Sequence, residues 1–327
     1  MLKYAALIVT FNRKDKLVKA LDSLLSQSIL PEKIVLVDNA STDGTQDMLK
    51  AGGYLDNERL QFIELPTNVG GSGGFYAAFE AAKQLDVDWV SISDDDANFG
   101  PDYFAAMAKA IDRHPDAGGF TSEVKLPDGR IDVTHRFHMI DKRLLRWREI
   151  PAENYDTDFK VDGFTFVGSF LSMHTIKEVD SPEKDFFIWW DDLDYSVRVT
   201  KTTDVYNAPG AVINHDTPSN AMDLKHSYHP DWRNYYGTRN MFFAFWKNAH
   251  PVLKYPYLLY KIARLYLNLV SPRLKYGRKY ELFTASQAMK DFFRGKKGLN
   301  EHFLPGSSKQ REAEYAEKVA AEQSKMK

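Results

Sequence analysis

Continuous apolar segments alternate with segments of helical periodicity along the first hundred residues. Residues 4–10 and 33–38 are mainly apolar without strict alternation, which is typical of strands buried on both faces. Residues 61–65 and 88–93 predict a third and a fourth strand. Leucines spaced three and four positions apart after the first of these segments predict a helix, which Pro31 stops. Strands that alternate with short helices indicate a mostly parallel sheet with right-handed crossovers. We therefore expect an α/β fold.

The composition is that of a globular protein with one large domain or two modest ones. The chain has 327 residues, of which 43% are hydrophobic and 27% charged. It has no cysteine, which excludes disulfides and thiolate metal sites and fits a reducing compartment. The first residues lack the pattern of a signal peptide, and no apolar run reaches the length that spans a bilayer. A cytoplasmic location is expected.

Positive charge is concentrated near the end of the chain. Residues 247–297 hold 12 Lys+Arg against 2 Asp+Glu, a local net charge of +10, whereas the residues before them are net acidic. Tyrosines and helically spaced leucines lie among these bases. The segment is either a helix packed on the rest of the protein with a solvated basic face, or an interfacial segment on anionic lipid. We predict peripheral docking on the inner face of the membrane, and the acidic remainder argues against nucleic acid as a partner.

Three consecutive carboxylates, Asp94, Asp95 and Asp96, follow the fourth predicted strand. No Lys or Arg lies within ten residues of Asp95, and adjacent acids repel one another unless a cation lies among them. Successive side chains of an extended chain point to opposite sides, so Asp94 and Asp96 can share one ion. Carboxylate oxygens suit Mg²⁺ or Mn²⁺. The alternative is a solvated acidic turn that caps a helix starting near Pro101.

Polar residues also follow the other predicted strands. Asn12-Arg13 follow the first strand and Asp38-Asn39 the second. Ligands of parallel α/β sheets bind at the carboxyl ends of the strands, so these residues and the three acids share an expected site. His215 follows residues 204–214, which predict two short strands, and a histidine with two carboxylates is a plausible ligand set for Mn²⁺.

A glycine-rich loop at residues 68–75 is expected to open a helix that runs to about Gln84. A dinucleotide fingerprint would require glycine at position 76, where the chain has tyrosine, and no phosphate-binding P-loop sequence is present. The glycines therefore either bring the backbone close to a ligand or permit tight packing.

Two tryptophans precede two carboxylates at residues 189–192. A tryptophan ring offers a flat apolar surface to a sugar, and a carboxylate beside it can take a proton from a sugar hydroxyl. In the alternative interpretation, Asp191 or Asp192 caps the helix that follows. A later helix begins with bases and aromatic residues at 232–240, and its N-terminus suits a phosphate. Residues 126–160 show no clean period.

The chain resembles the family 2 glycosyltransferases of the GT-A fold, and bacterial galactofuranosyltransferases most closely. The segments that carry the resemblance are residues 9–13, 68–75, 94–96 and 190–195, with His215 and residues 236–240 in the expected order. The similarity spans about residues 3–245. It implies a GT-A catalytic domain at 1–245 and a helical, basic and aromatic C-terminal extension at 246–327. The extra domains of mycobacterial polymerising enzymes are missing, which favours a single-linkage transferase.

The resemblance implies a metal-dependent, inverting hexosyltransferase of cell-surface polysaccharide assembly. The donor would be a UDP-sugar, UDP-galactofuranose, and the acceptor a glycan or a lipid-linked glycan. Transfer of rhamnose or another hexose is the alternative within the family. A protein that binds sugar nucleotides without turnover is the alternative outside it.

The resemblance also implies a role for individual residues. Asp192 would be the catalytic base, and Asp94, Asp96 and His215 would hold a divalent cation, Mn²⁺ or Mg²⁺. The donor-binding residues would be Thr10, Phe11, Asn12, Arg13, Asp38, Asn68, Gly71, Asp95, Tyr236 and Arg239. The acceptor-binding residues would be Gly168, Trp189, Trp190 and Asp191.

Overall fold

The computed structural model describes residues 2–217, 231–270, 277–308, 313 and 317. The chain divides into two compact units. The first comprises Met1–Asp141, Arg146–Lys184 and Asp191–Pro218, and the second comprises Lys142–Leu145, Asp185–Trp190 and Ser219–Lys327. We expected one domain at residues 1–245 and an extension at 246–327. The two units have different limits, and the expected domain limits stay a prediction.

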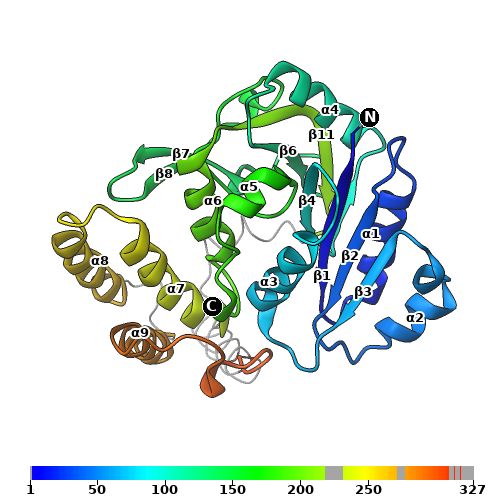
Figure 1. Ribbon diagram of the computed structural model, residues 1–327. Coiled ribbons are helices and arrows are strands. Elements are labelled where there is room, and N and C mark those ends of the chain that lie inside the picture. The colour runs from blue at the N-terminus through cyan, green and yellow to red at the C-terminus, as the bar shows by residue number, and fades with distance from the viewer. Residues whose placement is uncertain (1, 218–230, 271–276, 309–312, 314–316, 318–327) are drawn as a thin grey trace, which may run out of the picture. The chain divides into compact units, whose positions relative to one another are not determined.

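The first unit is built on an eight-stranded sheet (Figure 1). In spatial order its strands are β3 (Leu60–Glu64), β2 (Lys33–Asp38), β1 (Tyr4–Thr10), β4 (Trp89–Asp94), β10 (Ser169–Ser172), β6 (Gly119–Lys125), β11 (Val205–His215) and β5 (Ala97–Phe99). The first four are parallel, as expected for strands joined by crossover helices. Strand β10 runs antiparallel to both of its neighbours, and β5 runs antiparallel to β11, so the sheet is mixed.

Helices cover both faces of this sheet. The helices α1 (Lys14–Leu25), α2 (Thr45–Ala51) and α4 (Tyr103–Arg113) contribute to one core, together with every second residue of β1. The helices α3 (Gly70–Ala82), α5 (Met173–Glu178) and α6 (Asp191–Thr202) contribute to the other core, with the intervening residues of β1. Because successive residues of a strand point to opposite faces, β1 must be apolar throughout.

The glycine segment is helical from Gly70 onward, where a loop was expected. A Cβ atom added to Gly74 would lie 2.4 Å from Cγ1 of Val9, so glycine lets α3 approach β1 closely. Tight packing therefore accounts for Gly74. Gly71 differs, because a Cβ atom there would meet nothing within 4 Å.

Other departures from the expectations lie between residues 95 and 215. Strand β5 begins directly after the acidic run. The stretch without a clean period contributes β7 (Arg136–Asp141) and β8 (Arg146–Glu149), which form a three-stranded sheet with β9 (Gly163–Phe164). The two short strands expected before His215 are one strand, β11, whose register with β6 shifts between Asn207 and Val212.

The second unit contains the helices α7 (Arg233–Asn248), α8 (Lys254–Asn268) and α9 (Arg278–Phe293). Aromatic rings join α7 to α9, with the centroids of Phe242 and Phe292 5.6 Å apart. The predicted helical C-terminal extension is confirmed, although most of residues 308–327 lie outside the described residues. In the part of the chain that the structure describes, no helix has both the length and the apolar character to cross a membrane.

Candidate active site

The carboxyl ends of β1 and β4 lie side by side, with Val9 paired to Asp94. The next residue, Asp95, is 3% exposed and accepts a hydrogen bond from the Thr10 hydroxyl, with Oγ1 2.7 Å from Oδ2. Its Oδ1 lies 3.2 Å from the guanidinium of Arg13. The predicted donor-binding residues Thr10 and Arg13 therefore both contact Asp95.

Asp96 lies among three groups that carry or can carry positive charge. Its Oδ2 lies 2.9 Å from Arg13 and 3.4 Å from Lys16, and its Oδ1 lies 3.1 Å from Nε2 of His215. Burial raises the pKa of Asp96, but the hydrogen bond and charge of His215 and the charges of Arg13 and Lys16 outweigh it and lower that pKa. Lys16 was not among the predicted site residues. Its position three residues after Arg13, one helical turn on, is the signal that places both bases together.

The predicted metal ligands come together in the structure. One ligand atom from each of Asp94, Asp96 and His215 lies within 4.8 Å of the other two. Burial and the charges of Asp96 and Asp95 raise the pKa of Asp94, with His215 and Arg13 opposing them. A carboxylate whose ionised form is disfavoured by burial and by its neighbours gains from a bound cation. Two carboxylates and an imidazole fit Mn²⁺ or Mg²⁺.

The unexpected strand β5 brings His215 to the acidic residues. After Asp96 the chain enters β5, whose first residue, Ala97, pairs with His215 at the end of β11. The backbone N–H of Asp216 donates to the carbonyl of Asp96, 2.8 Å away. These contacts hold the end of β11 against the acidic run.

Polar contacts also join the end of β2 to the beginning of α3. Asn39 donates from Nδ2 to Oδ1 of Asn68, 3.0 Å away, and accepts from the N–H of Val69 at 2.9 Å. Asp38 accepts from the N–H of Ser41 at 3.1 Å through Oδ1, whereas its buried Oδ2 has no hydrogen-bond partner among the residues that the structure describes. Buried polar atoms are normally hydrogen-bonded, so Oδ2 of Asp38 is an acceptor suited to a ligand.

Asn12 links the loops that follow β1 and β2. It has a φ of 55°, a left-handed conformation that asparagine tolerates better than most residues. Its N–H donates to Oγ of Ser41, 2.9 Å away, and its Oδ1 accepts from the N–H of Thr42 at 2.7 Å. Phe11, the other predicted donor-binding residue of this loop, is half-buried.

An unusual backbone conformation precedes α6. Phe187, Trp189 and Trp190 have φ values of 69°, 64° and 76°, which are rare for aromatic residues. The side chain of Asn240 holds this segment, because its Nδ2 donates to the carbonyls of Phe186, Ile188 and Trp189 at 2.9, 3.0 and 3.0 Å. The ring of Trp189 is 42% exposed. Asn240 was not predicted as a site residue, although it follows Arg239 in the segment that carries the resemblance.

The chain continues from Trp190 into α6, which begins with Asp191 and Asp192. Burial raises the pKa of both carboxyl groups, and the charges of Asp191 and Asp94 raise that of Asp192 further. Asp192 also accepts from the N–H of Leu193 at 2.7 Å. It therefore has a capping contact as well as the raised pKa that suits a base.

Three other predicted residues lie in the protein interior. Gly168 has a φ of 70°, and a Cβ atom there would lie 2.0 Å from Oγ of Ser122. Tyr236 accepts from the N–H of Asn300 at 3.1 Å, and Arg239 donates to the carbonyls of Gly298 and Phe186 at 2.7 and 3.1 Å. These contacts are structural, and the predicted ligand roles of the three residues stay predictions.

Comparisons with known proteins give the family of the chain and its fold. Residues 5–172 match the family model described as Glycosyl transferase family 2. The galactofuranosyltransferase GlfT1 of Mycobacterium tuberculosis is 28% identical over 206 residues, which cover 60% of this chain and 64% of the relative. The match therefore spans less than two thirds of that relative's length.

Solved structures with a similar fold extend the comparison to more of the chain. S. aureus TarS in complex with UDP-GlcNAc is 15% identical, with a TM-score of 0.53 over 90% of this chain and 93% of that one. Mannosyltransferase PcManGT from Pyrobaculum calidifontis, in complex with GDP-Man and Mn²⁺, is 18% identical, with a TM-score of 0.52 over 98% and 79%. These likenesses confirm the predicted GT-A fold.

Proposed function

The chain belongs to glycosyltransferase family 2, and from that premise we propose that it transfers a sugar from a nucleotide donor to a glycan or lipid-linked acceptor. The observation that carries the proposal is the group of polar residues at the carboxyl ends of β1, β2 and β4. It combines the ligand set Asp94, Asp96 and His215 with the unpartnered Oδ2 of Asp38. Ligands of such sheets bind at these strand ends.

The donor we propose is UDP-galactofuranose. The similarity to galactofuranosyltransferase GlfT1 supports the sugar, and the UDP-GlcNAc complex of TarS supports a uridine nucleotide. Asp38, Asn68, Thr10 and Arg13 would bind the nucleotide, and the open space at Gly71 suits a nearby ligand. Rhamnose or another hexose is the competing assignment within the family.

The ligands Asp94, Asp96 and His215 would hold Mn²⁺ or Mg²⁺. When bound there, the ion would stabilise the negative charge that develops on the departing diphosphate. Arg13 and Lys16 contribute two further positive charges beside Asp96. These groups together would stabilise an anionic leaving group.

We assign the role of general base to Asp192. Its raised pKa makes its carboxylate a stronger base than an exposed aspartate, so it can accept the proton of an acceptor hydroxyl more readily. That hydroxyl would attack the anomeric carbon from the side opposite the diphosphate, which inverts the configuration. Trp189, Trp190 and Asp191 directly precede the base in the chain and would bind the acceptor.

We propose that α8 docks on an anionic membrane surface that carries a lipid-linked acceptor. Large apolar and aromatic side chains are exposed on α8 and at Val252, two residues before it, where a soluble helix is usually polar. The large exposed residues are Val252, Tyr255, Leu259, Tyr260 and Leu267, which are 71, 58, 69, 50 and 67% exposed. Apolar side chains within a segment of net charge +10 suit an interface with anionic lipid.

A screen of nucleotide sugars against thermal unfolding, with Mn²⁺ present, tests the donor. A ligand that binds the folded state raises the Tm, so UDP-galactofuranose should raise it more than UDP-galactopyranose, UDP-GlcNAc, GDP-mannose or dTDP-rhamnose. Release of UDP on addition of acceptor then distinguishes a transferase from a protein that only binds the donor. A larger rise in Tm with dTDP-rhamnose would mean that rhamnose, and not galactofuranose, is the sugar transferred.

Removal of the metal ligands tests the role of the cation. Asp96→Ala should abolish the Mn²⁺-dependent part of donor protection while the protein stays folded. Undiminished turnover in EDTA would contradict a metal-dependent mechanism.

A further inference from the structure

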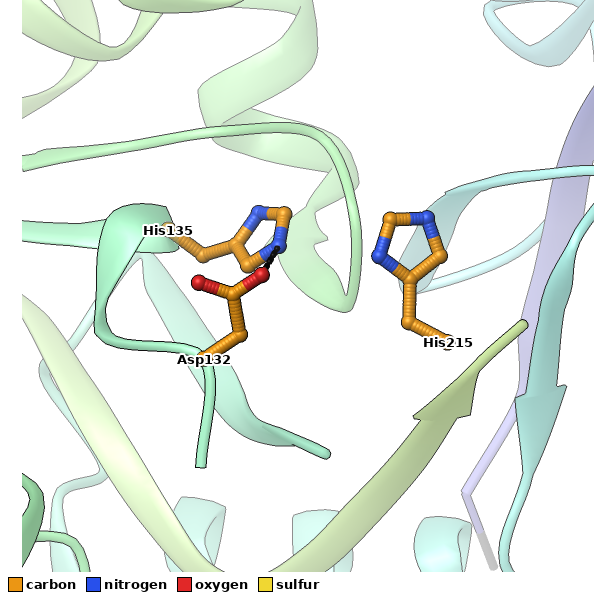
Figure 2. Close-up of side chains that lie close together, drawn as sticks. All are labelled: Asp132, His135 and His215. Carbon is orange, nitrogen blue, oxygen red and sulfur yellow. Dashed lines mark ion pairs between the residues drawn. The ribbon is translucent and has the colours of Figure 1, made fainter. Parts of the chain in front are cut away.

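A second group of ligand-type side chains also includes His215 (Figure 2). Asp132 precedes a short 3₁₀ helix, η2 (Val133–His135), and His135 ends it. One ligand atom from each of Asp132, His135 and His215 lies within 4.8 Å of the other two. Asp132 and His135 come from the stretch that showed no clean period, and neither has a role in the proposed transfer.

The side chains of this group are almost fully buried, and those of Asp132 and His135 are 11% and 10% exposed. Nδ1 of His135 lies 2.7 Å from Oγ1 of Thr165. A neutral ring that donates its Nδ1–H to Thr165 carries its lone pair on Nε2. Among the described residues that Nε2 has no partner with hydrogen-bond geometry, and its one polar contact is an ion pair of 3.4 Å with Oδ2 of Asp132 (Figure 2). A buried ring nitrogen that carries a lone pair and accepts no hydrogen bond can coordinate a metal ion.

His215 presents a different ring nitrogen to each group. Its Nε2 lies 3.1 Å from Asp96, on the side of the proposed catalytic cation. Its Nδ1 is buried, has no hydrogen-bond partner in the described part of the chain, and faces Asp132 and His135 (Figure 2). The ring centroids of His135 and His215 are 5.5 Å apart. Two ring nitrogens that lack a hydrogen bond within the described residues thus face the carboxylate of Asp132, and buried polar atoms are rarely left without one.

We propose that Asp132, His135 and His215 bind a transition-metal ion of the Zn²⁺ class, and that this ion competes with the catalytic cation for His215. Two imidazoles and one carboxylate are a common ligand set for Zn²⁺, with a fourth position left for water. The group of Asp94 and Asp96 is richer in carboxylate and suits Mn²⁺ or Mg²⁺ better. The two sites therefore differ in the metal that they select.

Competition follows from the chemistry of the shared ring. A neutral imidazole has one lone pair, so coordination through Nε2 places the hydrogen on Nδ1, and coordination through Nδ1 places it on Nε2. One neutral His215 can therefore serve only one of the two ions at a time. Binding of Zn²⁺ removes a ligand from the Mn²⁺ site and inhibits sugar transfer, a consequence that rests on the proposed function.

Direct binding measurements test the site without reference to activity. Titration of the metal-free protein with Zn²⁺, followed by calorimetry, should show a tight site that His135→Gln and Asp132→Asn each weaken at least tenfold. His174→Gln is the matched control, because His174 is 87% exposed and lies 3.5 Å from Glu178 on the surface. Unchanged Zn²⁺ affinity in both Asp132→Asn and His135→Gln, with their Tm close to that of the wild type, would overturn the proposal.

Competition is tested with Mn²⁺, whose free concentration is read from its electron paramagnetic resonance signal. One equivalent of Zn²⁺ should weaken Mn²⁺ binding at least tenfold in the wild type and in His174→Gln, and leave it unchanged in His135→Gln. Persistent competition in His135→Gln would mean that Zn²⁺ enters the Asp94 and Asp96 site directly, which contradicts the proposal.

Sugar transfer supported by Mn²⁺ provides the last measurement. His135→Gln should keep the wild-type rate and lose its inhibition by Zn²⁺, whereas His174→Gln should keep both. If the protein transfers no sugar but the binding results hold, the proposed function fails and the second metal site stands. If transfer occurs and Zn²⁺ inhibits His135→Gln as strongly as the wild type, the second site fails alone.

Discussion

Asp192 combines a capping contact with an environment that makes its carboxylate more basic. Asp192→Asn keeps the size of the side chain but removes its ability to accept a proton. We expect kcat to fall by about 10²–10⁴-fold, the usual contribution of a general base, while donor binding stays near normal. Asp191→Asn should mainly raise the KM for acceptor. Steady-state kinetics of both variants checks this, and reversed phenotypes would exchange the two roles.

The pH profile of the wild type gives an independent measurement of the same base. The base must be ionised to work, and burial raises its pKa, so activity should fall as the pH drops through a value well above the ordinary aspartate pKa of about 4. The residual activity of Asp192→Asn should lack this acidic limb. A wild-type profile that stays flat down to about pH 4 would exclude a base with a raised pKa.

Gly168 allows a separate test of backbone geometry. Gly168→Ala places a Cβ atom at positive φ, which costs about 1–2 kcal/mol, and also 2.0 Å from Oγ of Ser122. Gly129→Ala is a matched control, because Gly129 has a φ of 83° and open space around it. We expect Gly168→Ala to lower the Tm more than Gly129→Ala does, as measured by calorimetry. An equal fall in Tm for both variants would mean that the Ser122 side chain moves away from the new Cβ atom without loss of stability.

The sequence predicts a residue of the site where the last residue of an apolar strand is polar. Thr10, Asp38 and Asp94 each end a strand, so the sequence alone locates their shared edge of the sheet. Arg13 also follows a strand and was predicted in the same site, whereas Lys16 was not predicted. Arg13 and Lys16 contact Asp96 from about 80 positions earlier in the chain, and nothing local to the acids indicates them.

At the scale of elements, the four parallel strands β1 to β4 were predictable, whereas β5, β7 and β8 were not. Strands β1 and β2 have the predicted bounds, because their apolar runs are unbroken. Strands β7 and β8 have mixed polar sequences, and β7 begins with Arg136, which is fully buried and donates to main-chain carbonyls. A buried charged residue breaks the apolar pattern from which a strand is predicted, so the sequence does not indicate β7.

The glycine segment shows how tertiary packing can override a local propensity. Glycine disfavours helices by up to about 1 kcal/mol relative to alanine, so five residues that include four glycines predict a loop. The observed helix begins within that segment, where Gly74 packs against Val9 of β1. The need for close approach depends on the neighbouring strand, which a local pattern does not contain.

Helix α7 and the segment before α6 are coupled through Asn240. Asn240→Asp replaces the donating Nδ2 with an oxygen that faces three carbonyl oxygens. Loss of a buried hydrogen bond costs about 1–3 kcal/mol, so we expect a lower Tm and a higher KM for acceptor with the donor KM unchanged. Asn248→Asp, at the end of the same helix, is the control and should alter neither KM. An unchanged KM for acceptor in Asn240→Asp would mean that the segment before α6 does not contribute to acceptor binding.

At the scale of the whole molecule, charge is separated along the sequence, and the basic segment contains the exposed apolar face of α8. We expect binding to vesicles that contain anionic lipid, with affinity that falls steeply as salt increases, and little binding to zwitterionic vesicles. Co-sedimentation at two salt concentrations measures both effects. If the protein does not bind anionic vesicles at low salt, α8 serves only to pack against other parts of the protein.

A matched pair of double variants separates the apolar contribution from that of charge. Leu259→Ser with Leu267→Ser removes two exposed leucines of α8, and should weaken vesicle binding at least tenfold. Leu30→Ser with Leu55→Ser removes two exposed leucines of the first unit and should leave vesicle binding unchanged. Equal loss in both double variants would indicate non-specific adsorption.

The left-handed backbone at Trp189 and Trp190 implies that two kinds of selection would favour different amino acids there. Glycine adopts such φ values without the cost of about 1–2 kcal/mol that a residue with a side chain incurs. A library of variants sorted only for folded protein in the cell should therefore accumulate glycine or asparagine at these codons. The same library sorted for transfer onto acceptor should retain the aromatic rings. The divergence between the two enriched populations would measure how much stability the chain gives up for its function.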